Sequence, residues 1–285
     1  MKRICPKCGS LNQDHIRNGY FKRRRDGKTV QRFRCKICKK EFSDATFQAR
    51  YRQKLRHLNG VIEKEFISGS SIRRMAKTLG INPKTVSHRL EYLAKRARAS
   101  QARRLKKLKN IQEIQFDDME IFEHTKLKPL SITIAVVKKK RIILGAEVSQ
   151  MPAKGLIAKR SRKKYGRRKD HRKKARDSLF EKIKPSVSEF AQFESDQQPH
   201  YPESVQHHFP EAIHKTFKGR RACVTGQGEL KAGGFDPLFS LNHTCAMLRY
   251  AISRLVRRTW VTTKKIQQLQ NHIDIYIDYH NRLLV

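Results

Sequence analysis

Acidic residues are scarce in this chain of 285 residues, which has 25 aspartates and glutamates against 65 lysines and arginines. The resulting formal charge of +40 is far too large for an enzyme that acts on a neutral substrate. A field of this strength attracts polyanions, which means nucleic acid or an anionic membrane surface. The composition therefore favours a nucleic-acid-binding protein, although a basic composition alone does not separate an enzyme from a structural binder.

Long apolar runs are also missing. No segment approaches the ~18 consecutive apolar residues of a membrane-spanning helix, and residues 1–6 contain no apolar stretch of signal-peptide length. Both absences weaken the membrane interpretation. The six cysteines include two tight pairs, which indicates metal binding in a reducing compartment rather than disulfides. We therefore expect a cytoplasmic, nucleoid-associated protein with no membrane partner.

The two cysteine pairs predict a zinc ribbon over residues 1–45. Cys5 and Cys8 form one CxxC knuckle, and Cys35 and Cys38 form the other. Two thiolate pairs at this spacing can close a tetrahedral Zn²⁺ site. A segment this short has little core of its own, so metal binding would supply its folding energy. Basic residues between the knuckles favour DNA as the partner of the ribbon, although ribbons also mediate protein contacts.

Residues 50–98 predict a helix-turn-helix domain. Residues 71–79 have a short helical pattern, residues 80–82 form a turn, and Pro83 suits the first turn of a second helix over residues 84–93. The alternative is an ordinary helical hairpin. In the DNA-binding interpretation, the start of the second helix faces a major groove through Lys84, Thr85, Ser87, His88 and Arg89.

The character of the chain changes after a basic linker at residues 99–110. Three β-rich runs follow at residues 111–116, 130–137 and 141–148, and the last two are predicted to form a hairpin. The elements predicted after them are a mobile basic insertion at about 152–176, the end of a helix at 184, a strand at 190–193, a helix at 202–209, a strand at 212–217 and a loop at 219–234.

Two helices are predicted to close the chain. The first begins with the cap and first-turn pair Asp236–Pro237, and Asn242 lies inside it although Asn is a poor interior helix former. The second spans residues 266–284. The apolar face of the first helix is predicted from the spacing of Leu241, Cys245, Leu248, Ile252 and Leu255.

The few carboxylates cluster where a strand is predicted to end. Asp117 follows the run 111–116 directly, and Asp196 closes the run at 190–193. Carboxylates held at strand ends are a usual way to bind Mg²⁺, which prefers oxygen ligands. Asp118 is expected on the opposite face of its strand from Asp117. The alternative for both candidate ligands is a solvated acid at the end of a strand.

Three motifs resemble those of bacterial insertion-sequence transposases of the DDE type. They are Gln115–Glu120, Ser195–Gln197 and Leu241–Arg249, the last continuing to Trp260. The resemblance covers nearly the full length. It implies an α+β multidomain protein with a zinc ribbon, a helix-turn-helix and an RNase H-like catalytic domain over residues 111–285. That domain would contain a mixed five-stranded sheet.

In that family two aspartates and a third residue on a late helix hold magnesium. The resemblance assigns these roles, as catalytic residues and as ligands of two Mg²⁺ or Mn²⁺ ions, to Asp117, Asp196 and Asn242. The third residue is usually Glu, so this chain departs from the pattern, although some relatives carry Asn there. An Asn carbonyl brings no charge and implies a weaker second metal site. Glu229 and Asp236 are alternative third ligands.

The activity implied by the resemblance is transposition. The protein would bind the terminal inverted repeats of an insertion sequence as double-stranded DNA and act as a homo-oligomer. It would catalyse Mg²⁺-dependent strand cleavage and strand transfer into target DNA. The alternatives are a non-enzymatic DNA-binding regulator, an inactive transposase remnant and, more weakly, a structural RNA binder. Phosphate contacts are expected from Arg249, Arg254, Arg257 and Arg258.

Overall fold

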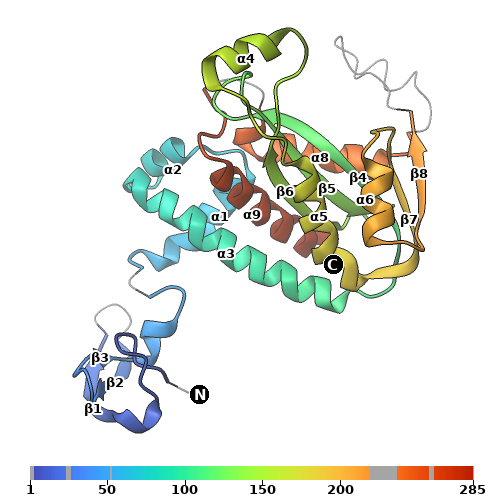
Figure 1. Ribbon diagram of the computed structural model, residues 1–285. Coiled ribbons are helices and arrows are strands. Elements are labelled where there is room, and N and C mark those ends of the chain that lie inside the picture. Colours follow the sequence, from blue (N-terminus) through green and yellow to red (C-terminus); the bar gives the residue numbers. More distant parts are fainter. Residues whose placement is uncertain (1–2, 24–26, 52, 219–235, 257–259, 285) are drawn as a thin grey trace. The chain divides into compact units, whose positions relative to one another are not determined.

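The chain folds into two compact units. The computed structural model describes residues 3–23, 27–51, 53–218, 236–256 and 260–284. The N-terminal unit is Met1–Leu58 and the C-terminal unit is Asn59–Val285 (Figure 1). The division lies near the predicted end of the ribbon. The predicted boundaries at residues 98 and 110 do not divide the C-terminal unit, which contains both the helical segment and the large sheet.

The N-terminal unit is built on a small antiparallel sheet. Its strands are β1 (His15–Lys22), β2 (Thr29–Cys35) and β3 (Glu41–Phe42), in the order β1-β2-β3. Short 3₁₀ turns lie at Asn12–Asp14, Asp44–Phe47 and Arg56–Leu58. The buried core is limited to Cys5, Phe33, Cys35 and Phe42. A core this small needs a covalent or metal cross-link for stability.

The C-terminal unit contains the mixed five-stranded sheet that the sequence predicts. Its strands are β4 (Ile111–Phe122), β5 (Pro129–Val137), β6 (Ile143–Gln150), β7 (Val187–Asp196) and β8 (Ile213–Phe217). The order across the sheet is β6-β5-β4-β7-β8. β5 pairs antiparallel with both β4 and β6, whereas β7 is parallel to β4 and to β8.

The first strand is longer than predicted. β4 continues beyond residue 116 to Phe122, because Met119 and Ile121 alternate with polar residues and are buried. Asp117 therefore lies within the strand and not at its end, which corrects the prediction. Asp196 is the last residue of β7, as expected.

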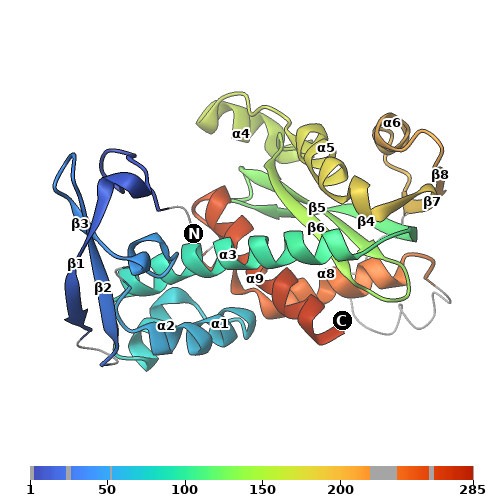
Figure 2. The ribbon, with the colours of Figure 1, turned by 90° about the horizontal axis from the view of Figure 1, so that it is seen from below.

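Helices cover both faces of the sheet. α5 (Arg172–Ile183) and α6 (Tyr201–His208) pack on one face, and α8 (Phe239–Ala251) and α9 (Ile266–Leu284) pack on the other (Figure 2). The first core is rich in aromatic rings, with Phe116 lying 5.2 Å from Phe180 between ring centroids. The second is mainly aliphatic. The sheet is thus buried on both sides, and polar residues inside it need specific partners.

The predicted limits of two late elements need correction. α8 begins at Phe239 and not at Asp236, whose carboxylate instead accepts a hydrogen bond from Leu238 N–H at 2.9 Å. It ends at Ala251, and a 3₁₀ turn at Ser253–Leu255 follows. The five predicted apolar positions are nevertheless all buried. The predicted loop at 219–234 lies outside the described residues.

Three helices precede the sheet. α1 (Asn59–Ile67) is followed by α2 (Ile72–Thr78) and α3 (Pro83–Lys107). The Asn82 side chain accepts a hydrogen bond from Lys84 N–H at 2.8 Å and caps α3, as predicted. α3 runs without interruption to Lys107 and so includes most of the residues predicted to be a basic linker.

Part of the basic surface of α3 is used inside the protein. Arg98 lies 2.5 Å from Asp274, and Arg104 lies 3.4 Å from Asp278, with both acids on α9. α9 thus places carboxylates opposite the arginines of α3. These arginines are not part of a fully solvated face.

The edge strand β6 is covered by side-chain amides. An edge strand exposes a row of backbone groups without a neighbouring strand. Asn281 on α9 accepts from Ile143 N–H at 2.9 Å and donates to its carbonyl at 2.8 Å. Gln270 of α9 likewise accepts from Val148 N–H at 2.8 Å and donates to Ala146 O at 2.9 Å. Gln101 on α3 donates to two β6 carbonyls, so both helices are fixed to the sheet edge.

The basic insertion is folded. A 3₁₀ turn (Gly155–Ile157) leads into α4 (Ala158–Tyr165), and Arg172 begins α5. The prediction of a mobile loop at 152–176 is therefore wrong. Arginine and lysine are good helix formers, and their charge concealed the helical pattern. Within the described part of the chain, no helix is both long enough and apolar enough to cross a membrane.

We expect Asn281→Ala to destabilise the C-terminal unit by about 2–3 kcal/mol, because the substitution leaves buried backbone groups of Ile143 unpaired. Urea unfolding followed by circular dichroism measures this loss. Gln268→Ala is the control, since its hydrogen bond to Glu91 lies on the surface. An equal loss in both variants would contradict the role given to Asn281.

Candidate metal and catalytic sites

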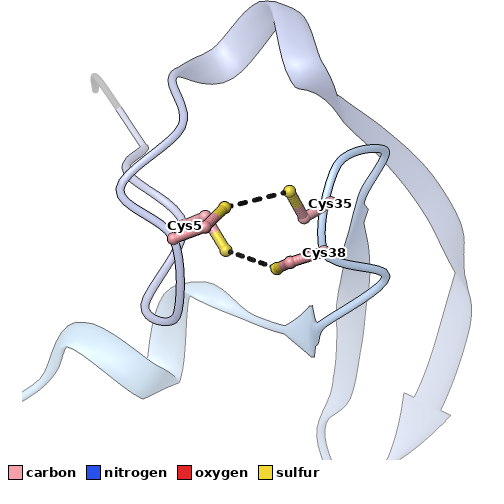
Figure 3. A group of neighbouring side chains, drawn as sticks. Cys5, Cys35 and Cys38 are labelled. Atoms are coloured by element: carbon pink, nitrogen blue, oxygen red, sulfur yellow. Dashed lines mark hydrogen bonds between the residues drawn. The ribbon is translucent and has the colours of Figure 1, made fainter.

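Four cysteines converge in the N-terminal unit. The ligand atoms of Cys5, Cys8, Cys35 and Cys38 all lie within 4.8 Å of one another. Cys5 and Cys38 sulfurs are 3.5 Å apart, and those of Cys8 and Cys35 are 3.6 Å apart (Figure 3). A tetrahedron with zinc–sulfur bonds of about 2.3 Å has sulfurs about 3.8 Å apart. The cluster is therefore compatible with a zinc site, as the sequence predicts.

Both knuckles use the same backbone turn. Cys5 N–H donates to Ser10 O, and Gly9 N–H donates to Cys5 O at 3.0 Å. In the second knuckle Cys35 N–H donates to Lys40 O, and Lys39 N–H donates to Cys35 O, both at 3.0 Å. Gly9 and Lys39 both have a positive φ, 75° and 59°, which turns the chain back after the second cysteine of each pair. The four thiols are thus positioned by local structure.

One thiol is ready to ionise. The Ser10 hydroxyl lies 3.1 Å from Cys35 Sγ and, together with the backbone N–H of Cys38, lowers the pKa of Cys35 to about 6. The thiolate is the form that binds metal. Cys35 can therefore act as a ligand at neutral pH.

In the C-terminal unit, Asp117 and Asp196 lie beside each other. The parallel pairing of β4 and β7 runs to Gln115 and Glu194. Continuing that register by two residues brings the two aspartates opposite each other on neighbouring strands. Asp117 shares its face with Met119, which packs beneath α8 and α9. By strand alternation the two acids belong to the side of the sheet that α8 covers, and one oxygen of Asp117 is also reached by Tyr201 of α6, from the other side.

Their pKa values reflect this arrangement. Burial and the charge of Asp196 raise the pKa of Asp117 to about 6. Burial also raises the pKa of Asp196, and the charge of Asp118 adds to the effect. Two carboxylates that resist joint ionisation are stabilised by a cation between them. A divalent cation with oxygen ligands suits this donor set.

A tyrosine orients Asp117. The Tyr201 hydroxyl on α6 donates to Asp117 Oδ1 at 3.0 Å, and Asp118 N–H donates to the same oxygen at 2.7 Å. Burial raises the pKa of Tyr201, so the hydroxyl keeps its proton. The Arg176 guanidinium stacks over the Tyr201 ring at 4.9 Å. Oδ1 thus accepts two hydrogen bonds, which fix the orientation of the carboxylate.

Asp118 belongs to the opposite face, as predicted. Its carboxylate accepts from Thr133 and lies 3.4 Å from Arg176 Nη1. Arg176 also donates to Ser204 Oγ at 2.9 Å and is 2% exposed. Asp118 thus serves packing of α5 on the sheet. This contact leaves Asp117 as the acid of β4 that faces Asp196.

A buried polar network lies directly behind the two aspartates. Gln115 donates to Glu194 Oε2 and to Pro237 O, both at 2.8 Å, and accepts from Leu241 N–H at 3.1 Å. Burial opposes the ionisation of Glu194, but Lys138 at 2.5 Å lowers its pKa overall. Gln115 thereby ties the start of α8 to β4 and β7, two residues from the acids.

Asn242 lies on α8, on the side of the sheet that the aspartates face. Its amide nitrogen donates to Asp236 Oδ2 at 2.8 Å. Its neighbour Cys245 lies close to Asp117, since burial raises the pKa of Cys245 to about 12 and the charge of Asp117 adds to that shift. The helix is therefore near the acids, and Asn242 contacts Asp236, one of the alternative third ligands. Glu229 lies outside the described residues.

The predicted DNA-contacting residues of α3 differ in their exposure. Lys84 and His88 are exposed at the start of α3, and Thr85 and Ser87 are partly buried there. Arg89 is 5% exposed, so it packs inside the protein and is not available to a groove of DNA.

The late arginines also separate into groups. Arg249 lies near Cys245, whose pKa it lowers in opposition to burial and Asp117. Arg254 donates to the carbonyls of Val261 and Thr262 at 3.2 and 3.3 Å, which is a structural role and not the predicted phosphate contact. Arg257 and Arg258 lie outside the described residues.

The sequence prediction missed Tyr201 and Arg176, because their roles arise from contacts between distant elements. Gln115 and Glu194 carried a usable signal. Both are polar residues next to buried apolar ones: Gln115 lies between Ile114 and Phe116, and Glu194 follows Phe193. Such positions indicate a specific buried partner.

Comparison of the chain with protein-family models gives no match, and comparison with curated proteins gives none either.

We expect the purified protein to retain one zinc ion per chain, bound by the four clustered thiolates, and Cys35→Ser to lose it. Metal analysis by atomic absorption measures the content. Cys245→Ala is the matched control, since Cys245 lies on α8 away from the cluster. Full zinc content in Cys35→Ser, or none in the parent, would contradict the assignment.

We expect Asp117→Asn to stabilise the metal-free protein at pH 8 by up to about 3 kcal/mol, because a carboxyl with a pKa of about 6 is costly to ionise in the fold. The gain should shrink as the pH falls from about 6 towards 4, where the parent carboxyl is protonated. Chemical unfolding in chelator measures both values.

Asp170→Asn provides a control of opposite sign. Arg172 lowers the pKa of Asp170, so losing this carboxylate should destabilise the protein at pH 8. If Asp117→Asn were also destabilising at pH 8 without divalent cations, the unfavourable ionisation of Asp117, caused by burial and by the charge of Asp196, would be disproved.

Proposed function

We propose that the protein is a DNA transposase of the DDE type, with Asn in the third position. The observation that carries this proposal is the adjacency of Asp117 and Asp196 on parallel strands, facing the helix that bears Asn242. Two raised carboxyl pKa values at one place are typical of a functional site. The formal charge of +40 suits a DNA substrate.

The fold supports the proposal. An RNase H-like domain is expected to have three antiparallel strands followed by two parallel ones, and the order β6-β5-β4-β7-β8 is consistent with it. α2 and α3, joined by a turn at residues 79–82, suit a helix-turn-helix with Lys84 and His88 exposed for DNA. A zinc ribbon in the N-terminal unit would add a second contact with the inverted repeats.

Asp117, Asp196 and the carbonyl oxygen of Asn242 would hold two Mg²⁺ ions. Bound Mg²⁺ supplies an activated water and neutralises charge on the reacting phosphate. Tyr201 and Asp118 N–H keep Asp117 Oδ1 engaged, which fixes the direction of Oδ2. Gln115 holds the start of α8, and so Asn242, against the strands. Arg249 places positive charge on the same helix.

The reaction has two steps. Water attacks the phosphorus at the end of the element, the P–O3′ bond breaks, and the element keeps a free 3′-hydroxyl. That hydroxyl then attacks a target phosphodiester and displaces the target 3′-oxygen. Two ends must be joined, so a homo-oligomer on double-stranded DNA is expected, in the cytoplasm of a bacterium.

The second candidate function is a DNA-binding regulator or an inactive transposase remnant. One observation favours it: the Asn242 amide is engaged with Asp236, and Asn supplies no negative charge for a second cation. Such a protein would keep the DNA-binding surfaces of both units and lack cleavage.

The test is Mg²⁺-dependent nicking of a duplex that carries the inverted repeats flanking the gene. We expect the parent to nick the repeat end, and Asp117→Asn and Asp196→Asn to be slower by at least about 100-fold, the scale of losing one charge-stabilising group. Band-shift measurements should show unchanged DNA binding.

Glu203→Gln is the matched control, because Glu203 is an exposed carboxylate of α6 paired with Lys173. It should nick like the parent. Specific binding by the parent with no cleavage in Mg²⁺ or Mn²⁺ would reject the transposase and favour the regulator.

A further inference from the structure

A strongly basic arm follows β6. It comprises residues 152–171 and contains the 3₁₀ turn Gly155–Ile157, α4 and the turn to α5. Asp170 is its one acidic residue, and it forms an ion pair with Arg172 at 2.6 Å. The basic residues of the arm are Lys154, Lys159, Arg160, Arg162, Lys163, Lys164, Arg167, Arg168 and Lys169.

The arm is fixed at its base. The buried Ser161 hydroxyl donates to Leu127 O at 2.6 Å. Arg168 donates to the carbonyls of Met151 and Pro129, both at 3.4 Å. Lys154 lies 3.3 Å from Glu120 on β4. These contacts hold α4 on the sheet end, so the arm presents its charges in a defined position.

Two features of the arm face outward. A cleft of about 750 Å³ is lined by four cations, Arg162, Arg167, Arg168 and Lys169, together with Asp170 and small residues. Leu156 is fully exposed, and the adjoining Ile157 is 38% exposed. A side chain with the exposure of Leu156 buries no apolar area within the protein. Both features suit a partner that offers phosphates beside apolar surface.

We propose that the arm grips duplex DNA through its basic cleft and inserts Leu156 between base pairs as a wedge. Leucine is among the side chains that proteins use to unstack a base step and kink the duplex. The exposed apolar surface is too narrow for a membrane-bound helix, which needs a continuous apolar face. A second copy of the arm is disfavoured by like charge.

The topology places the wedge near the two aspartates. β4, β6 and β7 run in the same direction, so their C-terminal ends share one end of the sheet. The arm leaves β6 at that end, and Asp196 closes β7 there. Leu130 of β5 pairs with Ile121 of β4 on one side and with Gln150 of β6 on the other. Ile121 is four residues, or about 13 Å, along β4 from Asp117. The wedge would distort DNA close to the bond that is cut.

The test uses permanganate, which oxidises unstacked thymines, on the inverted-repeat duplex bound by the full-length protein without Mg²⁺. The parent should produce a local reactive step, and Leu156→Ser should reduce it to the level of free duplex. Its DNA affinity should stay within about threefold, because phosphate contacts dominate binding. Leu156→Met should restore the reactivity. Leu283→Ser, which changes an exposed leucine of α9, should keep it.

Undiminished reactivity in Leu156→Ser, or none in the parent, would overturn the wedge. So would Leu156-dependent binding to phosphatidylserine vesicles with unchanged DNA reactivity, which would identify a membrane surface instead. The inference takes from the proposed function only that the partner is DNA, and it does not require DNA cleavage. Because the readout needs no cleavage, a Leu156-dependent distortion without nicking would reject the transposase alone, and nicking without such distortion would reject the wedge alone.

Discussion

The repulsion between Asp117 and Asp196 is the constraint on which the site depends. In a chain with so few acids, two of them are placed on adjacent parallel strands, in a partly buried position where joint ionisation is unfavourable. Neighbouring polar side chains hold the two aspartates in this position. Gln115 and Glu194 bind the strands to α8, and Tyr201 fixes one oxygen of Asp117. The arrangement is costly for stability alone and suits a cation.

The remaining charges are divided between structure and surface. Acids of α9 pair with Arg98 and Arg104 of α3, and Asp118 pairs with Arg176 of α5. Side-chain amides complete the edge of β6 and link α3 to the same sheet that carries the aspartates. α3, which would be the DNA-recognition helix in the proposed function, is therefore bonded to the same sheet that carries the candidate site. Among the described residues, Lys154 and Arg168 are the cations of the basic arm with an ion pair to the end of the sheet, and in the proposed function the others would contact DNA.

Much of the fold followed from the sequence, since the cysteine spacing, the strand patterns and the closing helix at 266–284 are local signals. Two errors come from the interpretation of charge. The helix in the basic arm follows from the helix propensity of arginine and lysine, and the burial of Arg89 depends on tertiary packing that the sequence does not show. Charge at these positions suggested solvent exposure. Asp117 was expected at a strand end because two acids interrupt an apolar run, yet Met119 and Ile121 continue the alternation.

The most direct measurement is anomalous diffraction from crystals of the protein bound to inverted-repeat DNA and soaked with Mn²⁺. The account predicts anomalous density between Asp117 and Asp196, on the side of the sheet that α8 covers, and its loss in Asp117→Asn. Strong Mn²⁺ density elsewhere with none between these two carboxylates, in crystals where the DNA is well ordered, would contradict the central claim.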